Sequence, residues 1–184
     1  MPEGAPAPTP VSNEKREKIP IKDNSSFDSE IKRKLISKDG QIFEVDKKSL
    51  QISILLKNLV NAFPKAVIVM NNIDGKLLNS IISYMDEYQT KKPKEIPKPL
   101  PSPDLKLVLS KFDFEFINSF SLEECIDLVN AADFLYIIEL INLSSAKIAS
   151  EMINCSIEEV REKFGIVPDM TEEEMAEYDT YPLD

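Results

Sequence analysis

A helix-start signal occurs three times in the C-terminal third of the chain, and it constrains the fold more than any other feature. Ser121, Ser156 and Thr171 are each followed, three residues later, by a glutamate. The hydroxyl of such a cap accepts a hydrogen bond from the amide of the glutamate, whose carboxylate reaches back to the amide of the cap. Because both bonds satisfy donors that the first turn of a helix leaves unpaired, the pattern predicts consecutive helices with sharply defined starts.

Charge is distributed unevenly along the chain. Residues 113–184 carry 18 acidic side chains against three basic ones, whereas residues 1–112 carry 14 acidic and 19 basic side chains. The net charge is −10, and nucleic-acid affinity depends on neutralising phosphates, so we expect no nucleic-acid partner. An acidic helical array behind a near-neutral front half is typical of a docking surface rather than of an active site.

Several residue types that catalysis or cofactor binding requires are missing. There is no histidine, which excludes Ser-His-Asp and Cys-His relays and zinc sites built with imidazole. The glycines of Asp39-Gly40 and Asp74-Gly75 are isolated and form no phosphate-binding loop. An enzyme using an acidic pair such as Glu173 and Glu177 is the alternative, but acids at this spacing usually form the solvated face of a helix. We therefore expect no enzymatic activity, no cofactor and no metal site.

The apolar runs and the cysteines bear on the cellular setting. Runs such as residues 136–141 are too short to span a bilayer, and residues 1–10 lack the apolar core of a secretory signal. Cys125 and Cys155 lie in helical patterns and are expected to pack as small hydrophobes. We expect no membrane partner and a location in the cytoplasm and nucleus.

The front half of the chain predicts a small α/β unit. Residues 35–38 and 41–45 flank Asp39-Gly40, a dipeptide suited to a two-residue hairpin turn. A helix is expected over residues 48–60 and a buried strand over residues 66–70. Apolar residues at i, i+3, i+4 and i+7 mark two helical stripes, one in this half and one after it: Leu78, Ile81, Ile82 and Met85, and then Leu122, Cys125, Ile126 and Val129.

Two segments have the composition of chain without regular structure. Residues 1–33 are rich in proline and charge, and are expected to form a disordered tail. Residues 91–103 hold five prolines and four lysines, which favours an extended, solvated loop. The alternative for this loop is a proline-rich recognition segment in the polyproline II conformation.

Five segments carry motifs that occur in the same order in one known family: residues 37–46 (SKDGQIFEVD), 112–116 (FDFEF), 128–135 (LVNAADFL), 156–166 (SIEEVREKFGI) and 169–174 (DMTEEE). They resemble the opening hairpin, the Trp-Asp-x-Glu-Phe segment, the Ala-Ala-Asn-Tyr-Leu helix and the two closing signatures of the S-phase-kinase-associated (Skp) adaptor family of SCF cullin-RING ubiquitin ligases. The resemblance extends from residue 34 to residue 178.

The resemblance implies an α+β fold and a bridging function. A BTB/POZ-type α/β domain (34–90 and 104–153) would be interrupted by the Pro/Lys-rich loop (91–103) and followed by a C-terminal helical extension for F-box docking (154–184). The implied function is that of a non-catalytic adaptor linking F-box substrate receptors to the N-terminal domain of a cullin. Elongin C shares the BTB/POZ core but ends earlier, so residues 160–178 favour the Skp family. The alternative is an F-box-binding structural subunit of a non-ligase assembly that has lost cullin binding.

The family's binding residues transfer to this chain at matching motif positions. Asp133 and Phe134 occupy the Asn-Tyr pair that faces cullin in the family, with core packing of Phe134 as the alternative. The apolar positions that receive the F-box fall at the C-terminal end, and burial within the chain is the alternative for them: Val160, Phe164, Ile166, Met175 and Tyr178. Because such a face is sticky when empty, we expect a homodimer in the absence of the partner.

The chain also departs from the family pattern. It has no tryptophan, so the Asn-x-Trp that clasps the receptor is missing, and Pro182 cannot lie in a helix interior. Residues 91–98 are basic where the family has an acidic loop, and the N-terminal tail has no counterpart. These differences predict an altered choice of receptor.

Overall fold

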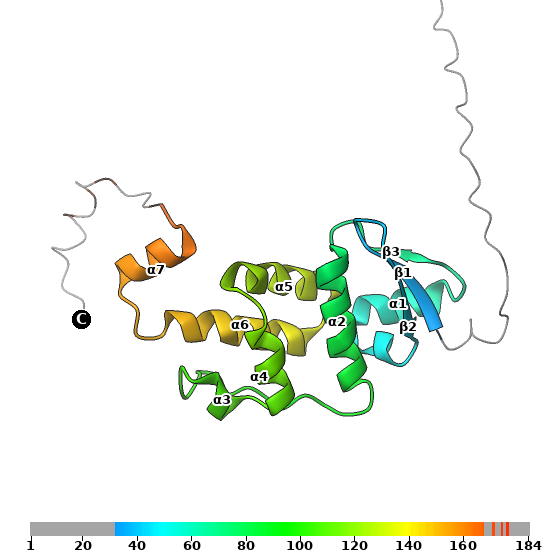
Figure 1. The fold of residues 1–184 in the computed structure, drawn as a ribbon, viewed down its shortest axis with the longest axis horizontal. Coiled ribbons are helices and arrows are strands. Elements are labelled where there is room, and N and C mark those ends of the chain that lie inside the picture. Colours follow the sequence, from blue (N-terminus) through cyan, green and yellow to red (C-terminus); the bar gives the residue numbers. More distant parts are fainter. Residues whose placement is uncertain (1–31, 168–170, 172–173, 175, 177–184) are drawn as a thin grey trace, which may run out of the picture.

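The computed structural model describes residues 32–167, 171, 174 and 176. A small sheet and α1 lie at one end, α2 to α6 form the middle, and α7 lies beyond the end of α6 (Figure 1). The α+β fold expected from the sequence is confirmed. The elements are β1 (Lys32–Ile36), β2 (Ile42–Asp46), the 3₁₀ turn η2 (Ser49–Ile52), α1 (Ile54–Ala62), β3 (Ile68–Val69), α2 (Gly75–Tyr88), α3 (Leu105–Val108), α4 (Lys111–Asn118), α5 (Leu122–Leu135), α6 (Ile138–Met152) and α7 (Ile157–Phe164).

The sheet has the order β2-β1-β3, with β1 antiparallel to β2 and parallel to β3. The predicted hairpin is confirmed, but its turn is wider than two residues. Ser37 N donates to Gln41 O at 3.0 Å, and Gly40 N donates to Ser37 O at 3.0 Å. Gly40 has φ of 81°, a left-handed conformation that a residue without Cβ adopts without strain. Three residues therefore close the hairpin, with glycine at the left-handed position.

The expected start of the folded region is wrong by two residues. Strand β1 begins at Lys32, so residues 32 and 33, which we expected in the tail, belong to the sheet. Arg33 is only 8% exposed and pairs with Val45 across the hairpin. Residues 32–34 are all basic, so their composition did not indicate a strand whose alternate residues are buried. The rest of the predicted tail, residues 1–31, lies outside the described residues.

Two elements in the front half are shorter than expected. The helix predicted over residues 48–60 is divided into η2 and α1 by Ser53, whose hydroxyl accepts a hydrogen bond from Leu56 N as the cap of α1. The strand predicted over residues 66–70 is reduced to β3, where Ile68 is buried and Val69 is 51% exposed. The expectation of a buried strand over residues 66–70 is therefore only partly correct.

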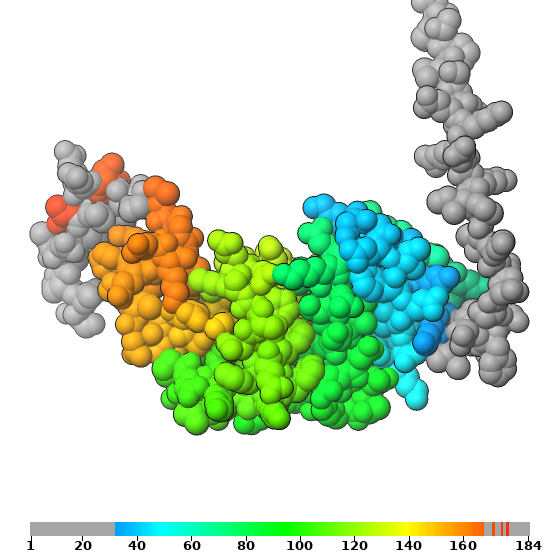
Figure 2. All heavy atoms as spheres, in the orientation of Figure 1, coloured from blue at the N-terminus to red at the C-terminus, as the bar shows by residue number. Residues whose placement is uncertain are grey.

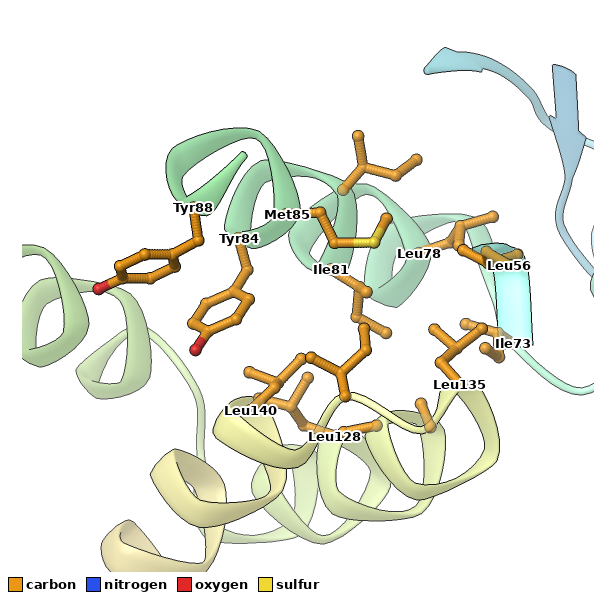
Figure 3. Packing of buried hydrophobic residues seen from close by; sticks show 14 of the residues in the cluster. Leu56, Ile73, Leu78, Ile81, Tyr84, Met85, Tyr88, Leu128, Leu135 and Leu140 are labelled. Carbon is orange, nitrogen blue, oxygen red and sulfur yellow. The ribbon is translucent and has the colours of Figure 1, made fainter. Parts of the chain in front are cut away.

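One core joins α2 to the pair formed by α5 and α6. The predicted stripe on α2 is confirmed, since all four of its residues are buried. Ile81 of this stripe points toward Leu128, Leu135 and Leu140, and Leu78 lies beside Leu56 (Figure 3). The stripe expected on α5 is partly wrong, because Ile126 is 40% exposed. The buried residues of α5 are Cys125, Leu128, Ala131, Ala132 and Leu135.

A buried carboxylate connects α4 to α2. Asp113 is 4% exposed and accepts hydrogen bonds from the Tyr88 and Ser110 hydroxyls, each at 2.7 Å. Burial, together with the Asp113 carboxylate, raises the pKa of Tyr88 above its ordinary value. The motif at residues 112–116 therefore has a structural role, with Phe112 and Phe116 packed against the tyrosines of α2.

The Pro/Lys-rich loop is mostly exposed, but it is attached to α6. Lys98 Nζ donates to Asn142 Oδ1 at 2.8 Å, and Lys94 Nζ donates to Val108 O at 2.7 Å. Ile96 and Leu100 pack against the core. The loop and the start of α6 enclose a groove of about 580 Å³. The loop is irregular and mostly exposed, as expected, but its contacts with α6 and the core were not predicted, because they join segments that are distant in the sequence.

Candidate protein-docking surfaces

Two of the three predicted helix starts are confirmed, and the helix expected after Thr171 lies largely outside the described residues. Ser121 with Glu124, and Ser156 with Glu159, each make both reciprocal bonds, at the starts of α5 and α7. At the third signal, Thr171 N donates to Glu174 Oε2 at 2.8 Å and Glu174 N donates to Thr171 Oγ1 at 3.3 Å. These caps fix where the helices that present the surfaces begin.

The described part of the chain exposes apolar surfaces suited to protein partners. Within it, no three His, Cys, Asp or Glu side chains are grouped so as to hold a metal ion. The same residues include no helix with the length and apolar content needed to cross a membrane. Exposed large apolar side chains occur at several places on the described residues. Two groups of them, one at each end of α6, include positions where we expected partners to bind.

The first of these, which we term the junction surface, lies where α1 meets the turn between α5 and α6. The backbone holds these segments together, since Ile54 N donates to Tyr136 O at 3.4 Å. Each side chain of the surface is between 43% and 52% exposed. Its members are Ile54, Phe134, Tyr136 and Ile138.

A buried serine holds together the two segments that form the junction surface. Ser53 caps α1, and its hydroxyl also donates to Leu135 O at 2.5 Å. This bond fixes the start of α1 to the end of α5, although the two residues are 82 positions apart. Ser53 is fully buried, so the bond is shielded from competing water. Ile54 is thereby placed beside the end of α5.

Helix α5 ends in a left-handed tyrosine. Tyr136 has φ of 55°, a conformation that costs a residue with a Cβ about 1–2 kcal/mol. Tyr136 N donates to Asp133 O and Ile137 N donates to Ala132 O, both at 2.9 Å, which are the two bonds of a Schellman motif. Glycine is the usual residue at this position. The turn buries Ile137 and leaves the Tyr136 ring 52% exposed.

The residues that we expected to face cullin lie on this surface. Asp133 is exposed and Phe134 is 45% exposed, so core packing of Phe134 is ruled out. Sequence reasoning missed Ile54, Tyr136 and Ile138. The sequence does contain a signal for Tyr136 and Ile138, since both belong to the apolar run 134–138. In the structure, only Leu135 and Ile137 of this run are buried. No local signal indicates Ile54, since its position depends on the long-range Ser53 bond.

The second surface, which we term the α7 surface, follows the end of α6. None of the residues of α7 is buried. Val160 and Phe164 lie one turn apart and are half-buried, and Ile166 is 52% exposed. Complete burial within the chain is therefore excluded for these three expected F-box residues. Met175 and Tyr178, the other two, lie outside the described residues.

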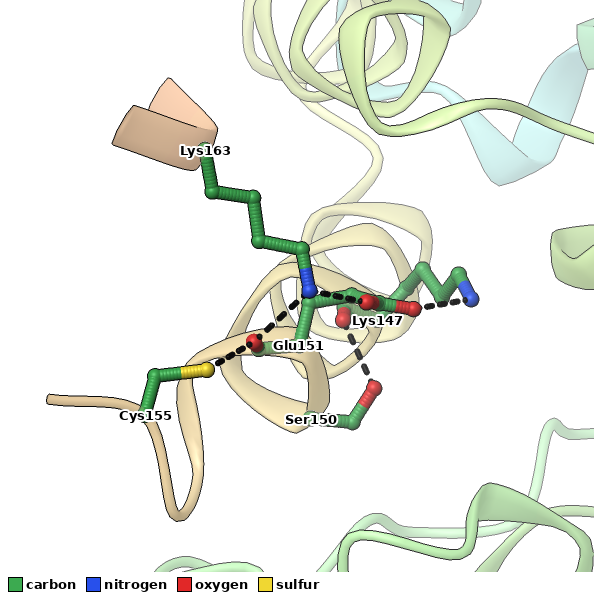
Figure 4. A network of polar contacts seen from close by, with 5 residues as sticks. All are labelled: Lys147, Ser150, Glu151, Cys155 and Lys163. Carbon is green, nitrogen blue, oxygen red and sulfur yellow. Dashed lines mark hydrogen bonds and ion pairs between the residues drawn. The ribbon is translucent and has the colours of Figure 1, made fainter. Parts of the chain in front are cut away.

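Glu151 connects α6 to α7 through a polar network (Figure 4). Its carboxylate pairs with Lys147 Nζ at 2.8 Å and with Lys163 Nζ at 2.6 Å. Lys163 Nζ also donates to Glu151 O at 3.1 Å, and Cys155 Sγ donates to the same carbonyl at 3.2 Å. The hydrogen bonds from Lys147 and Lys163 lower the pKa of Glu151 to about 2.

This lowered pKa predicts a loss of the α6–α7 contact in acid. The ionised form of Glu151 is favoured in the folded chain, so the stabilisation is complete above the ordinary pKa of 4.5 and disappears as the pH falls towards 2. We expect an NMR titration of the Glu151 carboxyl to give a pKa below about 3, with Lys163 resonances moving in the same range. Because part of the network is solvent-accessible, molar salt should raise this pKa. A titration midpoint near 4.5 in low salt would contradict the network.

Comparison with known proteins agrees with this architecture. Residues 32–90 match the "Skp1 family, tetramerisation domain", and residues 139–179 match the "Skp1 family, dimerisation domain". An S-phase kinase-associated protein 1 homolog of Tetrahymena thermophila is 33% identical over 147 residues, which covers 79% of this chain and 89% of the relative. SKP1-like protein 9 of Arabidopsis thaliana is 31% identical over 144 residues, with coverage of 77% and 88%.

A further Arabidopsis relative, SKP1-like protein 17, is 28% identical over 145 residues and covers 78% of this chain and 89% of its own. Together, the two matched domains contain both the sheet with α1 and α2 and the segment with α6 and α7. The matched segments include α7 and Ile54, whereas Phe134, Tyr136 and Ile138 of the junction surface lie between them. The chain belongs to the Skp1 family of adaptor proteins.

Proposed function

We propose that this chain is the non-catalytic adaptor of an SCF-type ubiquitin ligase and links an F-box substrate receptor to the N-terminal domain of a cullin. The observation that carries the proposal is the presence of two apolar surfaces at opposite ends of α6. This helix has 15 residues, so a rise of 1.5 Å per residue separates its ends by roughly 22 Å. Two partners can therefore be bound at the same time.

The junction surface is the proposed cullin site. Phe134 supplies an exposed aromatic anchor, of the kind that dominates the affinity of protein interfaces. Ile54, Tyr136 and Ile138 enlarge the apolar area around it. Asp133 adds a negative charge at the same helix end, and a basic side chain on the cullin would complement it.

The α7 surface is the proposed F-box site. Val160, Phe164 and Ile166 offer apolar contacts to a helix of the receptor, which is a recurrent mode of peptide recognition. Met175 and Tyr178 extend this site in the proposal. An apolar surface of this kind is unfavourable in water, so the free chain forms a homodimer, which light scattering over a range of concentrations can detect.

The remaining parts of the proposal follow from the chemistry of the chain. The ligase reaction belongs to other subunits in this proposal, and the chain supplies no histidine for it. Its acidic balance disfavours nucleic acid, and no membrane partner is proposed. The adaptor acts in the cytoplasm and nucleus, where ubiquitin ligases of this type meet their substrates.

A mixing experiment tests the proposal. The purified chain, an F-box fragment and a cullin N-terminal fragment should elute together from size exclusion as a ternary complex. Phe134→Lys is expected to weaken cullin binding at least about thirtyfold, because it places a charge in the centre of the apolar contact, and to leave F-box binding unchanged. Ile126→Lys is the control, since Ile126 is a similarly exposed residue elsewhere on α5. A chain that binds F-box fragments but no cullin would overturn the ligase role.

A further inference from the structure

Helix α7 is held in place by little other than polar contacts. It contributes no buried residue to the core, and it forms a lobe beyond the end of α6 in the space-filling view (Figure 2). Among the described residues, every hydrogen bond between a side chain of α7 and another helix runs from Lys163 to Glu151. Packing alone therefore does not determine the orientation of α7.

The connection between α6 and α7 does not fix this orientation by itself. Only four residues, 153–156, separate the two helices. Asn154 has φ of 67°, and asparagine is one of the few residues that adopt this left-handed conformation readily. A short irregular segment of this kind acts as a hinge unless a contact between the two helices fixes the angle between them.

The contact between Lys163 and Glu151 fixes the angle between α6 and α7. Glu151 lies in the last turn of α6 and Lys163 in the last turn of α7, so their ion pair spans the hinge at 2.6 Å. A second bond, from Lys163 Nζ to Glu151 O at 3.1 Å, restricts the ammonium group further. Lys163 and Phe164 lie on the same helix, so anchoring the amine to α6 restrains the orientation of the helix that presents the Phe164 ring.

We propose that Glu151 and Lys163 form a latch that orients the α7 surface for the receptor. The two are positioning residues, because they act through the placement of Phe164. This inference rests on the proposed function of the α7 surface as the F-box site. Lys147, by contrast, pairs with Glu151 within α6 and does not cross the hinge. The chain therefore contains its own matched control for the loss of one ion pair.

The test uses the full-length chain and four variants: Glu151→Gln, Lys163→Met, Lys163→Arg and Lys147→Met. Calorimetry with an F-box fragment should show affinity about fivefold weaker for Glu151→Gln and Lys163→Met, the range expected for one charge-assisted hydrogen bond. Lys163→Arg should restore the affinity to within about twofold, since arginine keeps the charge and the donors. Lys147→Met should change the affinity less than about twofold.

Hydrogen exchange separates positioning from general stability. Amides of α7 should exchange faster in Glu151→Gln and Lys163→Met, whereas those of α2 and α5 should exchange as in the unmodified chain. Equal losses of affinity for Lys147→Met and Lys163→Met would overturn the latch, as would faster α7 exchange with unchanged affinity. Failure of the unmodified chain to bind any F-box fragment would instead refute the proposed function and, with it, the docking role of the latch.

Discussion

Replacing Phe164 by glutamate is expected to weaken binding of an F-box fragment at least about thirtyfold, because a charge then replaces the aromatic anchor of the α7 surface. The thermal midpoint should change by less than about 2 °C, since substitutions that leave the core intact rarely alter stability by more than about 0.5 kcal/mol. Phe164 is only half-buried, in a helix with no buried residue. Calorimetry for binding and circular dichroism for melting give the two values.

Glu162→Lys is the control for this variant. Glu162 lies on the exposed side of α7, two residues from Phe164, so its replacement changes the charge of the helix without removing an apolar contact. We expect its affinity to stay within about threefold of the unmodified chain. Similar losses in the two variants would show that the receptor reads the charge of α7 and not its apolar face, and would contradict the proposed site.

Among the variants proposed for this chain, Ile81→Ala is expected to lose the most stability. Ile81 is fully buried at the centre of α2, where it faces the leucines of α5 and α6 (Figure 3). Removing its buried methyl and methylene groups leaves a cavity and should lower the free energy of unfolding by about 3 kcal/mol. For a chain of this size, the thermal midpoint should fall by about 10 °C. Urea unfolding followed by circular dichroism measures the loss.

Ile126→Ala is the matched comparison for the core. Both residues are isoleucines in helices that the sequence pattern places on an apolar stripe, but Ile126 is 40% exposed. We expect its replacement to cost less than about 1 kcal/mol, since most of the side chain already contacts water. Equal losses of stability for the two replacements would contradict the orientation of α5, in which Ile126 faces the solvent.

The sequence predicted best those features that depend on neighbouring residues. The boxes at Ser121 and Ser156 fixed helix starts because the cap and its glutamate are three residues apart, so no distant contact is needed. The stripe on α2 was correct because one face of that helix carries its apolar residues. The Asp39-Gly40 hairpin was found for the same reason, with only its turn length wrong.

Predictions that depended on distant contacts were less successful. The face of α5 was only partly identified, because small residues at Ala131 and Ala132 are buried while Ile126 is exposed. The Lys-rich loop was expected to be solvated, yet Lys98 bonds to Asn142, which lies 44 residues away. Ile54 joined the junction surface through a bond spanning 82 residues. Local composition carries no information about such pairings.

The position of α7 outside the core has a consequence for how this chain can diverge. A receptor-binding residue that also supports the core is constrained twice, by folding and by recognition. The described residues of α7 escape the first constraint because none of them is buried. Under the proposed function, mutations on this helix alter which receptor is recruited while the rest of the molecule keeps its stability, so new receptor preferences can evolve without compensating changes in the core.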